Sequence, residues 1–81
     1  MDIQKIVLEA AEEVLGLEQE DMLDNMDMNL WEEGLLDSVS MASFLAEIED
    51  RIRRKIDVKE LSPEDMASFH SIIAAVERLK K

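Results

Sequence analysis

The chain has 81 residues, of which 20 are acidic and 9 basic, so its formal net charge is -11. This charge excludes nucleic acids and anionic membrane surfaces as partners and favours basic protein surfaces. Because the chain has no cysteine, it has neither disulfides nor a thiol of its own. The length predicts one domain over residues 1–81, with a core but no room for a deep enzyme cleft.

The composition favours helices over strands. Only Gly16, Gly34 and Pro63 interrupt the chain, and strand-favouring residues such as Val, Thr and Tyr are scarce or absent. The longest uncharged stretch, residues 66–76, is far shorter than the ~20 residues that span a bilayer, and the N-terminus has no signal-peptide pattern. We therefore expect a cytoplasmic monomer that is not an integral membrane protein.

The N-terminal half predicts one helix followed by a long loop. Residues 3–15 place apolar side chains at helical spacing, with Asp2 as a start signal and Gly16 as a left-handed end. Residues 17–37 have no sustained period, which predicts an irregular loop. Trp31 is expected to be a buried core anchor under this loop. The apolar residues expected to pin the loop are Leu23, Leu30, Trp31, Leu35 and Leu36.

A second long helix is predicted over residues 38–53. Its basic last turn, RIRRK, suits the negative end of the helix dipole. Phe44 is expected at the edge of the buried stripe. The predicted stripe itself consists of Val39, Met41, Ala42, Leu45, Ile48 and Ile52.

The C-terminal part predicts a link and two further helices. Ile56 and Val58 alternate with charged residues, as in a short extended link. Ser62, Pro63 and Asp65 form a start signal for a short third helix. The last helix has one apolar face, formed by Ile72, Ile73, Val76 and Leu79. The predicted fold is all-α, a small four-helix bundle with three long helices, one short helix and a long loop between the first two.

No metal site or catalytic centre is predicted. The stretch DNMDMNLWEEG has oxygen ligands at alternate positions, but Leu30 and Leu36 replace the glycine and glutamate that a calcium loop requires. His70 has no second histidine or cysteine to share a metal and is interpreted as a polar residue near a helix start. Ser38 has no base marked out for nucleophilic catalysis, so we expect no enzyme activity of its own.

Asp37 and Ser38 stand where the long loop becomes the second helix. On structural grounds alone, either residue could be a helix cap. A serine hydroxyl at a helix N-terminus is also exposed, and it lies where backbone N–H groups favour a phosphate. An acidic neighbour could hold a divalent cation for a phosphorylated donor. The two interpretations are a plain cap and a serine presented for modification by a phosphate-linked group.

The stretch GLLDSVSMASFLAEIEDR, with an acidic loop before it and SPEDMASFHSI after it, resembles the acyl carrier protein family over essentially the whole chain. The resemblance implies that Ser38, preceded by Asp37, carries 4′-phosphopantetheine from coenzyme A. It also implies a phosphopantetheinyl transferase and an acyl or aminoacyl ligase or synthase as partners, each with a basic docking surface. The partner-contacting positions that it implies are Val39, Met41, Glu47, Glu49 and Asp50.

Residues around this motif narrow the subtype of carrier. Ser40 and Ser43 stand where carriers of fatty-acid synthesis usually have acidic residues. LWEEGLLDS followed by EIEDR is similar to the D-alanyl carrier proteins of teichoic acid modification. EDMASFHSII departs from the Thr-Pro pair common in those carriers, so a D-alanyl carrier and another stand-alone carrier both remain open. A helical adaptor that binds a basic peptide, with Ser38 only a cap, is the alternative from another class.

Overall fold

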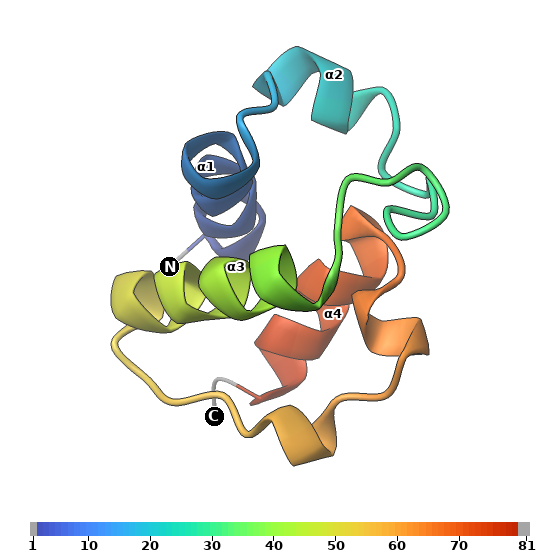
Figure 1. Ribbon diagram of the computed structural model, residues 1–81. Helices are drawn as coiled ribbons and strands as arrows, with labels where there is room; N and C mark the ends of the chain where they lie inside the picture. Colours follow the sequence, from blue (N-terminus) through green and yellow to red (C-terminus); the bar gives the residue numbers. More distant parts are fainter. Residues whose placement is uncertain (1, 80–81) are drawn as a thin grey trace.

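The computed structural model describes residues 2–79, apart from the side chain of Val58 (Figure 1). In this part of the chain there are four α-helices, two 3-10 helices and no strand, which confirms the predicted all-α class. Three of the α-helices are long and one is short, which is the predicted number, but the short one lies within the predicted loop and not after Ser62. The helices are α1 (Ile3–Leu15), α2 (Gln19–Leu23), α3 (Ser38–Ile52) and α4 (Phe69–Leu79), and the 3-10 helices are η1 (Val58–Glu60) and η2 (Glu64–Met66).

Helix α1 begins and ends at the predicted signals. The Asp2 side chain accepts a hydrogen bond from the Lys5 backbone N–H at 3.1 Å. At the other end, Gly16 is left-handed, with φ 71°, and its N–H donates to the Glu12 carbonyl. A residue without a Cβ adopts this conformation at little cost, so the chain leaves the helix sharply.

The core forms where α1 packs against both α3 and α4 (Figure 1). The largest fully buried side chains of this core include Phe44, Phe69, Ile3, Ile48, Ile72 and Val7.

No helix among residues 2–79 combines the length and the apolar composition needed to cross a bilayer.

The predicted stripe of α3 was wrong at three positions. Phe44 is fully buried rather than at the edge, whereas Val39 is 77% exposed and Ala42 is also exposed. Phe44 is three residues after Met41 and four before Ile48, so a helix of 3.6 residues per turn brings these three side chains onto one face. The large aromatic ring therefore forms the centre of the buried face.

The predicted irregular loop contains a short helix, α2, which the sequence interpretation missed. Met22 is buried on it, while Leu23, expected to pin the segment, is 49% exposed. Further along, Leu30 and Leu36 are buried as predicted, and Leu35 is partly buried. Helix α2 is therefore held to the core by Met22 and not by Leu23, while Leu30 and Leu36 hold the rest of the loop.

Residues 25–36 are fastened to the segment that leads into α4. The Leu30 backbone N–H donates to the Ala67 carbonyl at 2.8 Å, and the His70 backbone N–H donates to the Met26 carbonyl at 3.0 Å. The Trp31 indole Nε1–H donates to the Met66 carbonyl, also at 3.0 Å. These bonds join two parts of the chain that are far apart in sequence.

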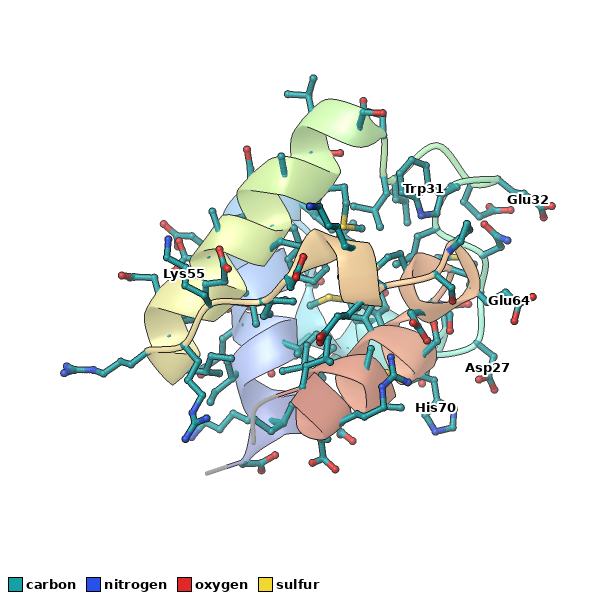
Figure 2. The ribbon with its side chains drawn as sticks, turned by 90° about the horizontal axis from the view of Figure 1, so that it is seen from below. Asp27, Trp31, Glu32, Lys55, Glu64 and His70 are labelled. Carbon is teal, nitrogen blue, oxygen red and sulfur yellow. The ribbon has the colours of Figure 1, made fainter. Side chains whose placement is uncertain are left out.

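The prediction that Trp31 is a buried core anchor was wrong, since its side chain is 40% exposed. The indole fastens the loop through its N–H while leaving part of its ring at the surface (Figure 2). His70, interpreted as an ordinary polar residue, adds an exposed contact from its Nδ1 to Asp27 Oδ1 at 3.0 Å.

The predicted third helix is a single 3-10 turn, η2. Its start signal is present, because Ser62 N–H donates to Asp65 Oδ2 at 2.9 Å and Asp65 N–H donates to Ser62 Oγ at 3.3 Å. Helix growth stops there because the next carbonyls, of Met66 and Ala67, accept from the loop instead of from the following turn. The link expected to be extended also contains a 3-10 turn, η1, beside buried Ile56.

Helix α4 buries most of the face that was predicted for it. Ile72 and Val76 are in the core, and Ile73 and Leu79 are partly buried against it. Ser68 and Ser71 form a hydrogen-bonded pair at the start of the helix, with the Ser71 N–H donating to Ser68 Oγ at 3.2 Å. These bonds satisfy backbone and side-chain groups at the start of α4 and fix where the helix begins.

Candidate functional site

Asp37, not Ser38, caps α3. Asp37 is extended, with φ -140° and ψ -176°, and its Oδ1 accepts from the Ser40 backbone N–H at 2.9 Å. Ser40 Oγ in turn accepts from the Asp37 backbone N–H at 2.9 Å. Two backbone donors at the helix start are thereby satisfied by a reciprocal pair of side chains, a capping box. The sequence interpretation had left open which of the two neighbours is the cap.

The capping box lowers the pKa of Asp37. The largest cause is the hydrogen bond from the Ser40 backbone N–H, followed by the bond from the Ser40 hydroxyl. Both bonds favour the charged form of the carboxylate, so Asp37 is ionised at neutral pH. A negative charge also suits the positive end of the α3 dipole.

Ser38 is the first residue of α3 and is exposed to solvent. None of the side-chain hydrogen bonds found among residues 2–79 involves its hydroxyl, since capping is done by Asp37 and Ser40. The Gly34 turn before it is held by the Leu35 and Leu36 N–H groups, which both donate to the Leu30 carbonyl. The serine hydroxyl is thus presented on a fixed backbone without a competing structural role.

An apolar groove of about 470 Å³ lies beside the first two turns of α3. Met41 and Leu45 form its wall on α3, Trp31 lines it from the loop, and Pro63 and Met66 line it from the segment around η2. Met41 and Leu45 follow Ser38 by three and seven residues, which is the spacing of one helix face. The groove is therefore on the same side of α3 as the serine.

The structure separates the remaining predicted site residues into two groups. Val39 is the most exposed large apolar side chain of those that the structure describes, and Asp50 is also exposed. Met41, in contrast, is only 8% exposed, and the part of it that reaches the surface lines the groove beside Ser38.

The two predicted glutamates are engaged within the chain. Glu47 Oε2 accepts from Arg51 Nε at 2.9 Å in a half-exposed ion pair. Glu49 Oε2 accepts from the Ile56 backbone N–H at 2.6 Å. Glu49 is thus a structural acceptor that fixes the chain after α3, a role that the sequence interpretation missed.

Neither a metal centre nor a catalytic constellation can be built from the described residues. No group of three or more His, Cys, Asp or Glu side chains among residues 2–79 is close enough to hold a metal ion. His70 contacts Asp27, and its backbone bond is to Met26, so within this part of the chain no contact joins it to Ser38. What the site offers is an exposed primary hydroxyl beside an apolar groove.

The sequence matches a known protein family and several known proteins. Residues 5–79 match a family described as a phosphopantetheine attachment site. D-alanyl carrier proteins of Enterococcus faecalis, Listeria welshimeri and Listeria monocytogenes are each 35% identical to the chain over 80 residues, which is 99% of this chain and the full length of each relative. These matches do not favour the adaptor alternative.

The family's members carry a covalently attached 4′-phosphopantetheine and are carriers rather than catalysts. The predicted resemblance and cofactor are thus confirmed, and the match spans nearly all of the described residues. The chain belongs to the phosphopantetheine-attachment family of carrier proteins.

Proposed function

We propose that the chain is a D-alanyl carrier whose Ser38 bears the 4′-phosphopantetheine arm. The exposed, hydrogen-bond-free hydroxyl of Ser38 at the start of α3 is the observation that carries this proposal. The names of the three relatives support D-alanine as the cargo. Delivery of that cargo for teichoic acid modification is part of the proposal.

The role of Ser38 is that of an acceptor in a reaction run by a partner transferase. Its Oγ forms a bond to the phosphorus next to the pantetheine of coenzyme A, and the bond to the departing adenosine bisphosphate breaks. The hydroxyl proton passes to a base on the transferase. The carrier contributes a hydroxyl that is accessible and fixed in position by the Asp37–Ser40 capping box.

The surroundings of Ser38 fit an anionic phosphate with a long neutral chain. The dipole of a 15-residue helix favours a phosphate at this end. The apolar groove lined by Trp31, Met41 and Leu45 is on the same side of the helix. When bound, the arm supplies a terminal thiol that holds an acyl group as a thioester, which the cysteine-free chain lacks by itself.

Partner enzymes are proposed to approach the exposed beginning and outer face of α3. Val39, next to Ser38, offers an apolar contact, and Asp50 and Glu47 offer negative charge. All charged residues between Ile6 and Asp50 are acidic, so this part of the chain attracts basic surfaces over a range set by the Debye length, about 8 Å at physiological salt.

The cargo is tested by loading. The phosphopantetheine-bearing protein is incubated with ATP in three separate reactions: D-alanine with a D-alanine ligase, L-alanine with the same ligase, and a fatty acid with an acyl ligase. The intact mass is measured after each reaction. We expect a mass gain of one alanyl group with D-alanine, lost on hydroxylamine treatment because a thioester is cleaved. Loading with the fatty acid but not with D-alanine, using a ligase for each, would contradict the proposed cargo.

A further inference from the structure

The three basic residues that follow α3 form a turn with a fixed backbone. We call Arg53, Arg54 and Lys55 the cationic turn. The Arg53 and Arg54 backbone N–H groups both donate to the Glu49 carbonyl, the latter at 3.2 Å. On the far side of the turn, the Ile56 N–H donates to the Glu49 carboxylate. Glu49 therefore binds the backbone on both sides of the cationic turn. Its hydrogen bonds fix the backbone that carries the three basic side chains.

Arg53 stands in a conformation that is costly for its residue type. Its φ of 58° is the only positive φ of a non-glycine residue among residues 2–79. Glycine is the usual residue at this place after a helix, because it has no Cβ to strain the left-handed backbone. Arg51, in the last turn, already serves the helix dipole. The strained position of Arg53 therefore points to a use for its side chain rather than to a need of the fold.

The side chains of the cationic turn have no ion-pair partner in the described structure. Arg51 pairs with Glu47 and Arg78 pairs with Asp65, but no ion pair within residues 2–79 involves Arg53, Arg54 or Lys55. All three are exposed. With Ala46, Glu49 and Asp50 they line an open hollow of about 640 Å³ at the end of α3.

The cationic turn and Ser38 lie at opposite ends of α3. At 1.5 Å per residue, about 22 Å of helix separates Ser38 from Arg53. Figure 2 shows Lys55 toward one end of α3, away from Trp31, which lines the groove near the other end. The charges at the two ends differ, because every charged residue of the loop before Ser38, residues 17–37, is acidic, whereas the bases after Lys5 begin at Arg51. The end of α3 near Ser38 is therefore acidic, while its far end carries bases beside the acids Glu47, Glu49 and Asp50.

The mixture of acidic and basic residues around the hollow favours a protein as its partner. A dense polyanion such as nucleic acid or an anionic bilayer would meet Asp50 on the same rim, and the net charge of -11 would repel it. A protein surface can offer carboxylates to the bases and a basic group to Asp50. Guanidinium groups pair with carboxylates through two parallel hydrogen bonds, which fixes orientation as well as position.

We propose that the cationic turn docks against an acidic patch on the ligase that loads the carrier, at a distance from the contacts around Ser38. The inference rests on the proposed function, because that function supplies the loading ligase. A single patch of acidic residues attracts a basic surface but leaves rotation of the carrier undefined. A second contact of opposite sign at the far end of α3 defines the rotation and directs Ser38 to the active site.

The test compares two double variants with the same net charge. R53Q/R54Q removes two charges from the cationic turn, and K5Q/K59Q removes two exposed charges outside the hollow. Both proteins, in the phosphopantetheine form, are loaded with D-alanine by the ligase at low and high ionic strength. We expect kcat/KM of R53Q/R54Q to fall about fivefold at low salt with kcat unchanged, and the control to stay within about twofold of the unsubstituted protein. At about 1 M salt, where the Debye length is about 3 Å, the difference should disappear.

A third variant, R53G, separates docking from stability. Glycine relieves the left-handed backbone, so the melting temperature should rise by about 4 °C while loading at limiting carrier slows. Equal slowing of the two double variants, or normal loading of R53G, would overturn the role of the cationic turn while leaving the proposed function in place. Failure of the unsubstituted protein to accept D-alanine would instead remove the proposed function and, with it, the partner named here.

Discussion

At the scale of single residues, capping and exposure at the start of α3 belong to different side chains. Asp37 and Ser40 cap the helix through reciprocal hydrogen bonds, and Ser38 between them has no structural duty in the described part of the chain. Ser40 occurs where the resemblance to fatty-acid carriers would place an acidic residue, and the capping box gives it a specific structural role. The arrangement explains how a serine at a helix start can remain available for modification.

Replacing Ser40 by alanine should weaken the fold without removing the candidate acceptor. The substitution removes one side of the capping box, and loss of such a cap costs about 1 kcal/mol. Urea denaturation followed by circular dichroism measures this change in the free energy of unfolding. Ser43→Ala, on an exposed face of the same helix, is the matched control and should change stability little. Equal stability of both variants would contradict the capping role.

The capping box also predicts how stability depends on acid. The pKa of Asp37 is lowered in the folded protein, so its contribution is fully present above the ordinary aspartate pKa of about 3.9 and is lost as pH falls through the folded value. Asp65 acts in the same direction, because the Ser62 backbone N–H and then Arg78 lower its pKa. In Asp37→Asn, the loss of stability between neutral and acid pH should be smaller than in the unsubstituted protein. An identical pH profile would refute this assignment.

At the scale of elements, the loop between α2 and α3 is held in place by residues that precede α4. The Trp31 indole donates to the Met66 carbonyl, and backbone bonds join Leu30 to Ala67 and Met26 to His70. These contacts also block extension of η2 into a longer helix. The position of Ser38 therefore depends on a segment about thirty residues further along the chain.

Trp31→Phe should loosen this connection while keeping most of the aromatic surface. The indole N–H bond is lost and the Met66 carbonyl loses a donor, for which we expect a destabilisation of about 1 kcal/mol. Hydrogen exchange of the Leu30 amide, bonded to Ala67, should be faster in the variant. Unchanged exchange at Leu30, with amides in the middle of α1 as the internal reference, would show that the indole does not hold the loop.

The buried face of α3 gives a second prediction for the elements. Phe44→Ala removes a fully buried ring and should cost about 3 to 5 kcal/mol, enough to unfold a domain of this size. Val39→Ala, on the same helix but 77% exposed, should change stability by no more than about 0.5 kcal/mol. Thermal denaturation of both variants decides the matter. A stable Phe44→Ala protein would contradict the central position of this ring.

The long helices were predictable because their signals are local. Asp2, Gly16 and the spacing of apolar residues define α1, and a cap at Asp37 or Ser38 together with the basic last turn marks the bounds of α3. The five-residue α2 was missed because one turn and a half is too short to establish a period. The position of Trp31 was missed for another reason. Its partner, the Met66 carbonyl, is 35 residues away, and nothing in the sequence near either residue indicates the pairing.

The candidate site was predictable in part. Asp37 and Ser38 stood out as a pair, yet the assignment of the cap required the geometry of Ser40. Glu49 looked like a surface acid because of its charged neighbours, whereas its carboxylate binds the Ile56 backbone after the chain has turned. A sequence pattern records which face of a helix a residue occupies but not which part of the chain returns to that face.

At the scale of the whole molecule, charge is the dominant property. The net charge of -11 is carried by a chain of only 81 residues, and its acidic residues repel one another in the folded state. The bases are concentrated after Asp50, so the repulsion is strongest in the first half of the chain. Stability should therefore depend on ionic strength as well as on packing.

Salt or magnesium should raise the melting temperature by screening this repulsion. We expect the melting temperature to increase from low to physiological ionic strength, and magnesium chloride to act more strongly than sodium chloride of equal ionic strength. Differential scanning calorimetry at neutral pH measures both effects. A melting temperature that is independent of salt and magnesium would show that repulsion among the acids does not limit the stability of this fold.

The central claim is that Ser38 is the acceptor of the phosphopantetheine arm. The most direct test is the intact mass after incubation with coenzyme A and a phosphopantetheinyl transferase of broad specificity, with Ser38→Ala and Ser43→Ala in parallel. The account predicts a gain of one arm in the unsubstituted protein and in Ser43→Ala, and no gain in Ser38→Ala. A gain that persists in Ser38→Ala, or no gain in any of the three while a control carrier is modified, would contradict it.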